Sequence, residues 1–165
     1  MTTISAKIVL DSISENDMRI TTLQLRYPRF IHAEFMTHRV FSRNARSSRA
    51  VPVKTLLSEV LDDPVIPLYW GKNQKGMQAD EEHNAPVKLI CANQQDPSLT
   101  DEIPVSREEA WLNARSQAVS IARQFAEAGY HKQVVNRLLE PFMHIDVVVT
   151  ATDWGNFFAL RDHPA

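Results

Sequence analysis

The sequence predicts an α+β fold in which a mostly antiparallel sheet is flanked by helices. Three observations lead to this prediction. Two segments near the N-terminus have the composition and alternation of strands, a long segment further on has the apolar periodicity of a helix, and a β-branched segment near the C-terminus reads as a third strand. The 165 residues, 44% of them hydrophobic, suffice for one ordinary core, so we expect a single domain over residues 1–165.

The N-terminal third of the chain predicts two strands and two helices. Residues 6–12 and 19–27 are the strands, with turn residues at 14–17 between them. Pro28 suits the first turn of a helix. That helix should be largely buried because its apolar residues are numerous: Phe30, Ile31, Ala33, Phe35 and Met36. Pro52 opens a second helix, which ends at residues 62–64.

The rest of the chain predicts a loop region followed by two helices, a strand and a last short helix. Residues 64–104 are rich in Pro, Asn, Gln and Asp, and within them residues 69–79 could cover a substrate or form a plain surface loop. Ser106 and Glu109 form a capping box that starts the longest helix, and Gly129 ends it. Its apolar face is expected at Trp111, Ala114, Ala118, Ile121, Ala122 and Phe125. A helix at 131–139, a strand at 145–150 and a short helix capped by Thr152 or Asp153 complete the chain.

Residues 37–49 form the most informative segment, because four arginines recur there among serines and an asparagine. The arginines stand at steps of four, three and three, which would align them on one face of a helix: Arg39, Arg43, Arg46 and Arg49. Arginine is suited to forked recognition of phosphate and carboxylate. The segment therefore predicts an anion site, and the alternative is a merely solvated face.

The same segment resembles the signature of flavin-dependent thymidylate synthases, R-H-R-x-x-S-x-N-x-x-S-x-R-Y. Six positions match in register: His38, Arg39, Ser42, Asn44, Ser47 and Arg49. Thr37 and Ala50 replace the family's Arg and Tyr. A later block, residues 131–161, is also similar to the family, with matches at Arg137, Asn156 and Arg161. Residues from about 56 to 104 do not align and are expected to be an insert, and the family's C-terminal helix is expected to be missing.

The resemblance implies a fold like that of thymidylate-synthase-complementing proteins and the reductive methylation of dUMP to dTMP. Methylenetetrahydrofolate and NADPH would be co-substrates, FAD the cofactor, and a homotetramer with shared sites the assembly. Cofactor contacts would come from His38, Arg39, Ser42, Asn44 and Asn156. Substrate contacts would come from Ser47, Arg49, Arg137 and Arg161, and Arg161 would act catalytically against the uracil ring.

Composition and the remaining residue types narrow the chemistry. The net charge of −2 confines any anion site to a local cluster, and a nucleic-acid domain would more often be basic overall. The single cysteine, Cys91, lies in an apolar context that favours a core position over a nucleophile, and it fits a reducing cytoplasm. No histidines are spaced as metal ligands, so no metal is expected. The N-terminus lacks a secretory signal and no apolar run approaches the roughly 20 residues of a membrane span.

Two other functions stay open at this point. One is an FAD- or nucleotide-binding relative without methyl transfer. The other is a non-catalytic module that grips nucleic acid with its arginine face. Among the remaining residues, we expect His32 to be a satisfied core group, Asp146 to pair with an arginine, and the C-terminal aromatic residues to pack: Trp154, Phe157 and Phe158.

Overall fold

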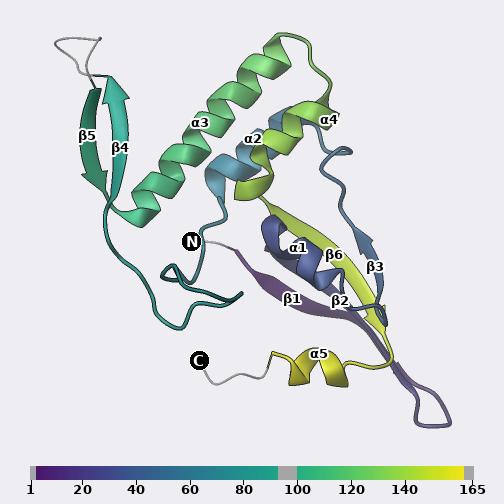
Figure 1. Cartoon of the computed structure of the whole chain (residues 1–165). Coiled ribbons are helices and arrows are strands. Elements are labelled where there is room, and N and C mark those ends of the chain that lie inside the picture. Colours follow the sequence, from purple (N-terminus) through teal and green to yellow (C-terminus); the bar gives the residue numbers. More distant parts are fainter. Residues whose placement is uncertain (1–2, 93–99, 162–165) are drawn as a thin grey trace.

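The computed structural model describes residues 3–92 and 100–161 (Figure 1). Its main sheet has four antiparallel strands in the order β1-β2-β6-β3: β1 Ser5–Ile13, β2 Arg19–Pro28, β6 His144–Ala151 and β3 Ser42–Ala45. A second sheet pairs β4, Val87–Ala92, with β5, Thr100–Val105. The helices are η1 Arg29–Ile31, α1 His32–Phe35, α2 Val53–Asp62, α3 Arg107–Glu127, α4 Lys132–Val135, η2 Asn136–Phe142 and α5 Gly155–Ala159. The predicted α+β fold with a mostly antiparallel sheet flanked by helices is confirmed.

Strand β6 lies inside the main sheet and supplies the apolar floor of one core. Four of its side chains face this core in alternation: Ile145, Val147, Val149 and Ala151. They pack with aromatic side chains from β2, α1 and the segment that follows α1: Tyr27, Phe35 and Phe41. The alternate β6 residues Val148 and Thr150 face the other side of the sheet, where Val148 is 44% exposed. One face of the sheet is therefore packed and much of the other is open.

A second core lies among the helices. Leu56 and Val60 of α2 are fully buried there, together with Val119 and Ala122 of α3 and Leu139 of η2. Figure 1 shows α2, α3 and α4 grouped beyond one end of the main sheet. The predicted insert at about residues 56–104 stays a prediction, but its first residues belong to this core.

Most of the predicted elements are confirmed. The strands at 6–12, 19–27 and 145–150 are present, as is the helix that Pro52 precedes. The capping box is complete, since Glu109 N donates to Ser106 Oγ at 3.2 Å and Ser106 N donates to Glu109 Oε2 at 2.9 Å. Gly129 follows α3 with a φ of 85°, a left-handed conformation that suits glycine.

Four predictions about local structure are wrong. The helix after Pro28 is short, so it meets the sheet along one side only and buries Phe35 alone. Its other large apolar residues are more than 40% exposed: Phe30, Ile31 and Met36. Within the arginine segment, Ser42–Ala45 form the strand β3 instead of a bend or a helix extension, because they pair with β6. Cys91 lies exposed on the strand β4 rather than in a core. Residues 131–139 divide into α4 and η2.

No helix in the described ranges, 3–92 and 100–161, is long and apolar enough to cross a membrane.

Candidate functional site

The strand β3 places the signature residues on both faces of the sheet. Ser42 and Asn44 lie opposite Thr150 and Val148, on the open face, and both are exposed. Arg43 and Ala45, which alternate with them along the strand, lie opposite Val149 and Val147 on the packed face. A strand alternates its side chains with a period of two, whereas a helix would have gathered the arginines on one side. The signature therefore contributes to two surfaces.

The arginines of the segment have different environments. Arg43 Nη1 donates to Phe35 O at 2.9 Å, and Arg46 donates to Glu59 at 2.9 and 3.2 Å. Arg46 also lies 3.5 Å from Asp146, so the prediction that Asp146 pairs with an arginine is confirmed. Arg39 and Arg49 are exposed, and the described residues give neither an ion pair. The continuous arginine face expected for a helix does not form.

His38 and Arg161 come together at the aromatic ring of Phe157. The His38 and Phe157 ring centroids are 5.1 Å apart, and Arg161 Cζ lies 4.2 Å from the Phe157 centroid. Arg161 Nη1 also donates to Phe157 O at 3.4 Å. Partial burial and the positive charges of Arg161 and Arg43 lower the pKa of His38 below its ordinary value. A neutral imidazole at neutral pH is therefore favoured beside a fixed cation.

The ring of Phe157 belongs to an aromatic cluster that supports these two residues. The ring centroid of Phe41 lies 4.7 Å from that of Trp154, 5.4 Å from that of Phe157 and 5.6 Å from that of His38, whose ring is stacked on it. The packing predicted for Trp154 and Phe157 is confirmed, and Phe158 contacts both although it is 58% exposed. The cluster fixes α5 against the sheet, and with it the position of Arg161.

A cavity of about 230 Å³ opens beside Arg161. Its walls are mainly apolar, and Glu34 supplies a carboxylate; the lining includes Leu25, Tyr27, Glu34, Phe35, Phe157 and Arg161. Tyr27 is 8% exposed, and burial raises its pKa to about 12, so the phenol stays protonated. The cavity thus combines apolar walls with one carboxyl group and one guanidinium.

A second cavity, of about 490 Å³, contains the predicted substrate residue Arg137. It is also lined by Arg29, His32 and Glu140, and Arg29 Nη2 lies 3.8 Å from Glu140 Oε1. His32 Nδ1 lies 2.8 Å from Tyr27 Oη, which confirms a satisfied but only half-buried histidine. Since Tyr27 lines the first cavity and His32 the second, one hydrogen bond joins the walls of the two.

The turn that carries Ser47 and Arg49 is fastened to η2. Asn136 is 1% exposed, and its Nδ2 donates to Ser48 O at 2.7 Å and to Val51 O at 2.9 Å. Ser48 Oγ donates to Glu140 Oε1 at 2.9 Å. These contacts bring Ser47 and Arg49 to the same region as Arg137, the residue that follows Asn136.

Most of the predicted site residues therefore form two groups within one chain, and Ser42 and Asn44 lie apart from both on the open face of the sheet. Ser47, Arg49 and Arg137 lie near η2, whereas His38 and Arg161 lie at the aromatic cluster. The strand β3 separates the groups, and its four residues span roughly 13 Å. Arg39 and Asn156 are exposed near the second group's segments, the turn after α1 and α5.

Several residues of the site carried no clear signal in the sequence. Tyr27, Glu34, Asn136 and Glu140 are not among the matched positions, although Asn136 and Glu140 lie within the similar block at residues 131–161. The alternation of β2 could have assigned Tyr27 to the buried side of the sheet, and an Asn within an apolar segment could have been suspected of a structural role. Glu34 and Glu140 stand in mixed segments that give no such indication. In the described part of the chain, no three His, Cys, Asp or Glu side chains are grouped as metal ligands.

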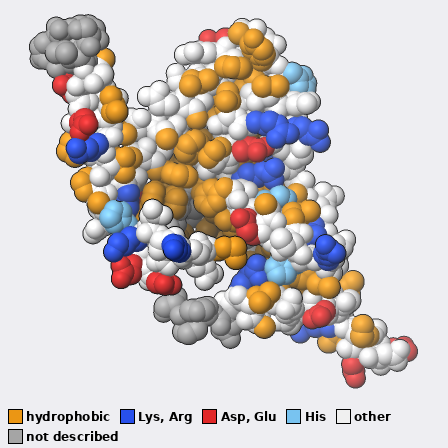
Figure 2. Space-filling view, in the orientation of Figure 1, with side chains coloured by type: hydrophobic (Ala, Val, Ile, Leu, Met, Phe, Trp, Pro, Cys, Tyr) orange, Lys and Arg blue, Asp and Glu red, His pale blue; other side chains and the backbone are white. Residues whose placement is uncertain are grey.

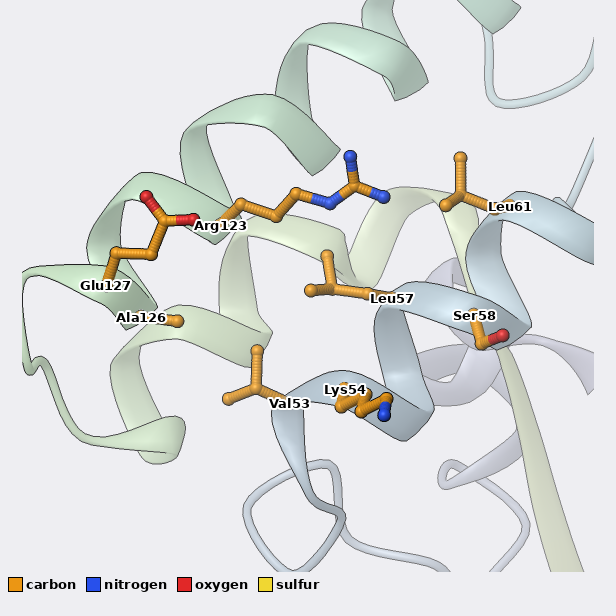
Figure 3. Close-up of a pocket in the computed structure, with 8 residues that line it drawn as sticks. All are labelled: Val53, Lys54, Leu57, Ser58, Leu61, Arg123, Ala126 and Glu127. Atoms are coloured by element: carbon orange, nitrogen blue, oxygen red, sulfur yellow. The ribbon is translucent and has the colours of Figure 1, made fainter.

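A further groove of about 500 Å³ lies between α2 and α3 (Figure 3). Val53, Leu57 and Leu61 line it from α2, and Arg123, Ala126 and Glu127 line it from α3. None of the predicted site residues lines this groove, so it is separate from the candidate site.

Comparisons with known proteins give a likeness in fold. No protein-family model matches the sequence, and no curated protein matches it. Two solved structures of a UMP/dUMP methylase, PolB from Streptomyces cacaoi, are similar to this chain, one bound with 5-Br UMP and the other with 5-Br dUMP. Both are 14% identical to this chain, and each match covers 92% of it. The matches cover 72% and 74% of the two methylase chains, with TM-scores of 0.57 and 0.58. At this identity the likeness shows the fold alone.

Proposed function

We propose that this chain is a flavin-dependent thymidylate synthase, which methylates dUMP to dTMP with methylenetetrahydrofolate as carbon donor and NADPH as reductant. The main observation in support of the proposal is that His38 and Arg161 both contact the ring of Phe157. These residues belong to the two separate segments that resemble the family, and Arg161 and Phe157 line one cavity. The fold of a UMP/dUMP methylase supports the same reaction class.

Arg161 is proposed to act on the uracil ring. A fixed guanidinium beside a carbonyl oxygen stabilises negative charge as it develops there during attack at the neighbouring ring carbon. The apolar walls of the cavity, including Leu25 and Phe35, strengthen this effect because they exclude water. His38, held neutral, adds no second full charge to the ring's surroundings.

The residues present fit a flavin in their chemistry. FAD, when bound, would carry hydride from the nicotinamide to the methylation reaction. His38 and Arg39 offer an imidazole and a cation, and Asn156 offers an exposed amide. Ser42 and Asn44 offer exposed hydrogen-bonding groups on the opposite face of the sheet. The cavity of about 230 Å³ is smaller than the roughly 300–1,000 Å³ of ordinary ligand pockets, so one chain supplies only part of the surface.

A shared site between subunits would account for the two separate groups. In a homotetramer, Ser47, Arg49 and Arg137 of one subunit would face His38 and Arg161 of another. Ser47 and Arg49 would then hold the phosphate or pyrimidine, and Arg137 would reach the nucleotide from the same side. This arrangement rests on the resemblance and on the separation of the groups by β3.

A nucleotide-binding relative without methyl transfer is the second candidate, and Thr37 favours it. Thr37 stands where the family has its first arginine, and its Oγ1 donates to Glu34 O at 2.7 Å. The position therefore offers no cation to a flavin phosphate. By contrast, the nucleic-acid alternative loses its basis, because Arg43 and Arg46 are engaged within the chain.

Absorption spectroscopy with FAD, followed by turnover, tests the proposal. We expect the purified protein to bind FAD and to form dTMP from dUMP when both co-substrates are present. Arg39→Ala should weaken FAD binding roughly tenfold or more, since it removes a charged donor. Arg123→Ala, in the groove between α2 and α3, is the matched control and should bind FAD normally.

The outcomes separate the candidates. Flavin and dUMP binding without dTMP formation would favour the relative that lacks methyl transfer. Absence of both flavin and dUMP binding in a folded protein would overturn both candidates.

A further inference from the structure

Two arginines and a histidine line the second cavity, the one of about 490 Å³, from three separate helical segments. Arg29 belongs to η1, His32 to α1 and Arg137 to η2. Arg29 and His32 are not among the positions matched to the signature, and the proposed function gives neither a role. On the face shown in Figure 2, Lys and Arg side chains stand in several separate groups with acidic side chains among them. An anion is therefore bound by a local set of donors and not by a general basic surface.

The hydrogen bond between Tyr27 and His32 determines which ring nitrogen of His32 carries the proton. Tyr27 Oη lies 2.8 Å from His32 Nδ1, and burial keeps the phenol protonated by raising its pKa to about 12. A buried hydroxyl needs an acceptor, and in the described part of the chain His32 Nδ1 is the acceptor within reach, so Tyr27 donates to it. The imidazole then carries its proton on Nε2. Since Tyr27 does not line the second cavity, Nε2–H is the donor that His32 has left for a ligand there.

Arg29 is fixed in position but keeps its hydrogen-bond donors. Its backbone N donates to Met143 O at 2.9 Å, which anchors η1 beside the end of η2. Among the described residues its guanidinium has one ionic contact, from Nη2 to Glu140 Oε1 at 3.8 Å, which is too long for a hydrogen bond. Glu140 Oε1 accepts instead from Ser48 Oγ at 2.9 Å. The exposed side chain of Arg137 has no ion pair within the described ranges, so both guanidiniums are available to a ligand.

The charges around the cavity favour an anion. Arg29 and Arg137 supply two positive charges against the single carboxylate of Glu140. Burial, followed by the charges of Arg29 and Arg43, lowers the pKa of His32, so the imidazole is neutral at neutral pH and its surroundings are positive. Donors that come from three segments suit a tetrahedral group with three free oxygens better than a planar carboxylate with two.

We propose that the second cavity binds a phosphate monoester, with Arg29 and Arg137 as charged donors and His32 Nε2–H as a neutral donor. Tyr27 is a positioning residue, because it fixes the tautomer of His32 from the wall of the neighbouring cavity. A volume of about 490 Å³ falls within the roughly 300–1,000 Å³ of ordinary ligand pockets, so there is room for more than the phosphate. The 5′-phosphate of dUMP is the monoester that the reaction supplies, and this choice of nucleotide rests on the proposed function.

NMR spectroscopy of protein labelled at histidine tests the donor role of His32. The ring nitrogen shifts should place the proton of His32 on Nε2. Inorganic phosphate and dUMP should each move these shifts and raise the pKa of His32, because a dianion favours the imidazolium. Deoxyuridine, which lacks the phosphate, should do neither. In Tyr27→Phe the proton should distribute over both ring nitrogens, and inorganic phosphate should bind severalfold more weakly.

Titration of arginine variants with inorganic phosphate tests the charged donors. Arg29→Gln should weaken binding roughly tenfold or more, because it removes a charged hydrogen-bond donor. Arg29→Lys should recover part of the affinity, since it restores the charge but not the fork. Arg123→Gln, in the groove between α2 and α3, is the matched control and should bind phosphate like the wild type. Circular dichroism checks that each variant is folded.

Three results would each overturn the proposal: the proton of His32 on Nδ1, equal responses to dUMP and deoxyuridine, or phosphate binding by Arg29→Gln as tight as by Arg123→Gln. FAD is the other source of phosphate, and a response of His32 to FAD as strong as to dUMP would show a diphosphate site instead of a monoester site. Formation of dTMP without any response of His32 would overturn this inference alone. A response to phosphate and dUMP without dTMP formation would support it while the proposed function fails.

Discussion

His38 and Arg161, from opposite ends of the sequence, both contact the ring of Phe157. The distances are 5.1 Å between the His38 and Phe157 centroids and 4.2 Å from Arg161 Cζ to the Phe157 centroid. The contact couples a titratable group to a permanent cation. It also makes the candidate site depend on how α5 is held against the sheet.

The coupling predicts the response of His38 to the loss of Arg161. Arg161→Ala should raise the pKa of His38 toward its ordinary value, because one of the positive charges that disfavour the imidazolium is removed. NMR titration of the His38 ring measures this directly. Arg123→Ala, remote from His38, should leave the titration unchanged, and an equal rise in both variants would contradict the assignment.

Kinetics should separate the roles of Arg161 and Ser47. Arg161→Ala should depress turnover more than it weakens dUMP binding, because the charge it stabilises develops in the transition state. Ser47→Ala should instead weaken nucleotide binding, by about 0.5–1.5 kcal/mol for a neutral hydrogen bond. Measurement of kcat and of the dissociation constant of dUMP for both variants checks this. Equal effects on binding would refute a separate catalytic role for Arg161.

His144 should make the protein less stable as the pH falls below neutrality. Its side chain is 1% exposed, Nδ1 lies 3.3 Å from Arg26 Nη2, and burial followed by the charge of Arg26 lowers its pKa, with Asp63 and Asp146 opposing. In the unfolded chain a histidine binds its proton near about pH 6.5. Below that pH the unfolded state holds more protons than the folded state, so the free energy of unfolding decreases.

Urea denaturation over a pH series checks the prediction for His144. The wild type should lose stability as the pH is lowered through 6.5, and His144→Gln should show a shallower dependence. Some slope should remain, because His32 and His38 also have lowered pKa values. His83→Gln, at an exposed position, should keep the wild-type slope; a variant of His144 with that same slope would contradict the argument.

Asn136 should contribute strongly to stability. Asn136→Ala leaves Ser48 O and Val51 O without their buried donor, and we expect a loss of about 2–4 kcal/mol in the free energy of unfolding. Ser116→Ala, which removes an exposed hydroxyl of α3, should change it by no more than about 0.5 kcal/mol. Urea denaturation of both gives the comparison, and a loss below about 1 kcal/mol for Asn136→Ala would show that the turn is held by other contacts.

Local patterns were sufficient for most of the fold. The alternation in β1, β2 and β6 and the capping box of α3 depend on neighbours in sequence, and these elements were predicted. The strand β3 was not, because the spacing of the arginines in residues 37–49 also fits a helix and only pairing with β6 decides between them. Cys91 was misplaced for a related reason: an apolar context does not reveal whether a ribbon is covered by a core.

The candidate site was predictable only in part. The matched motifs supplied His38 and Arg161, but their meeting at Phe157 depends on the path of the chain after β6. Asn136 acts through tertiary contacts, namely its two hydrogen bonds to the signature turn. Such contacts join residues that no local pattern relates.

The alternation of β3 has a consequence for how the signature can vary. Deleting or inserting one residue between Ser42 and Ala45 would exchange the faces of every residue beyond the change. Asn44 would turn toward the aromatic cluster, and a guanidinium would emerge on the open side. Homologues should therefore tolerate substitutions in this strand more readily than changes of length, and a gap here in an alignment would mark a protein with a different site.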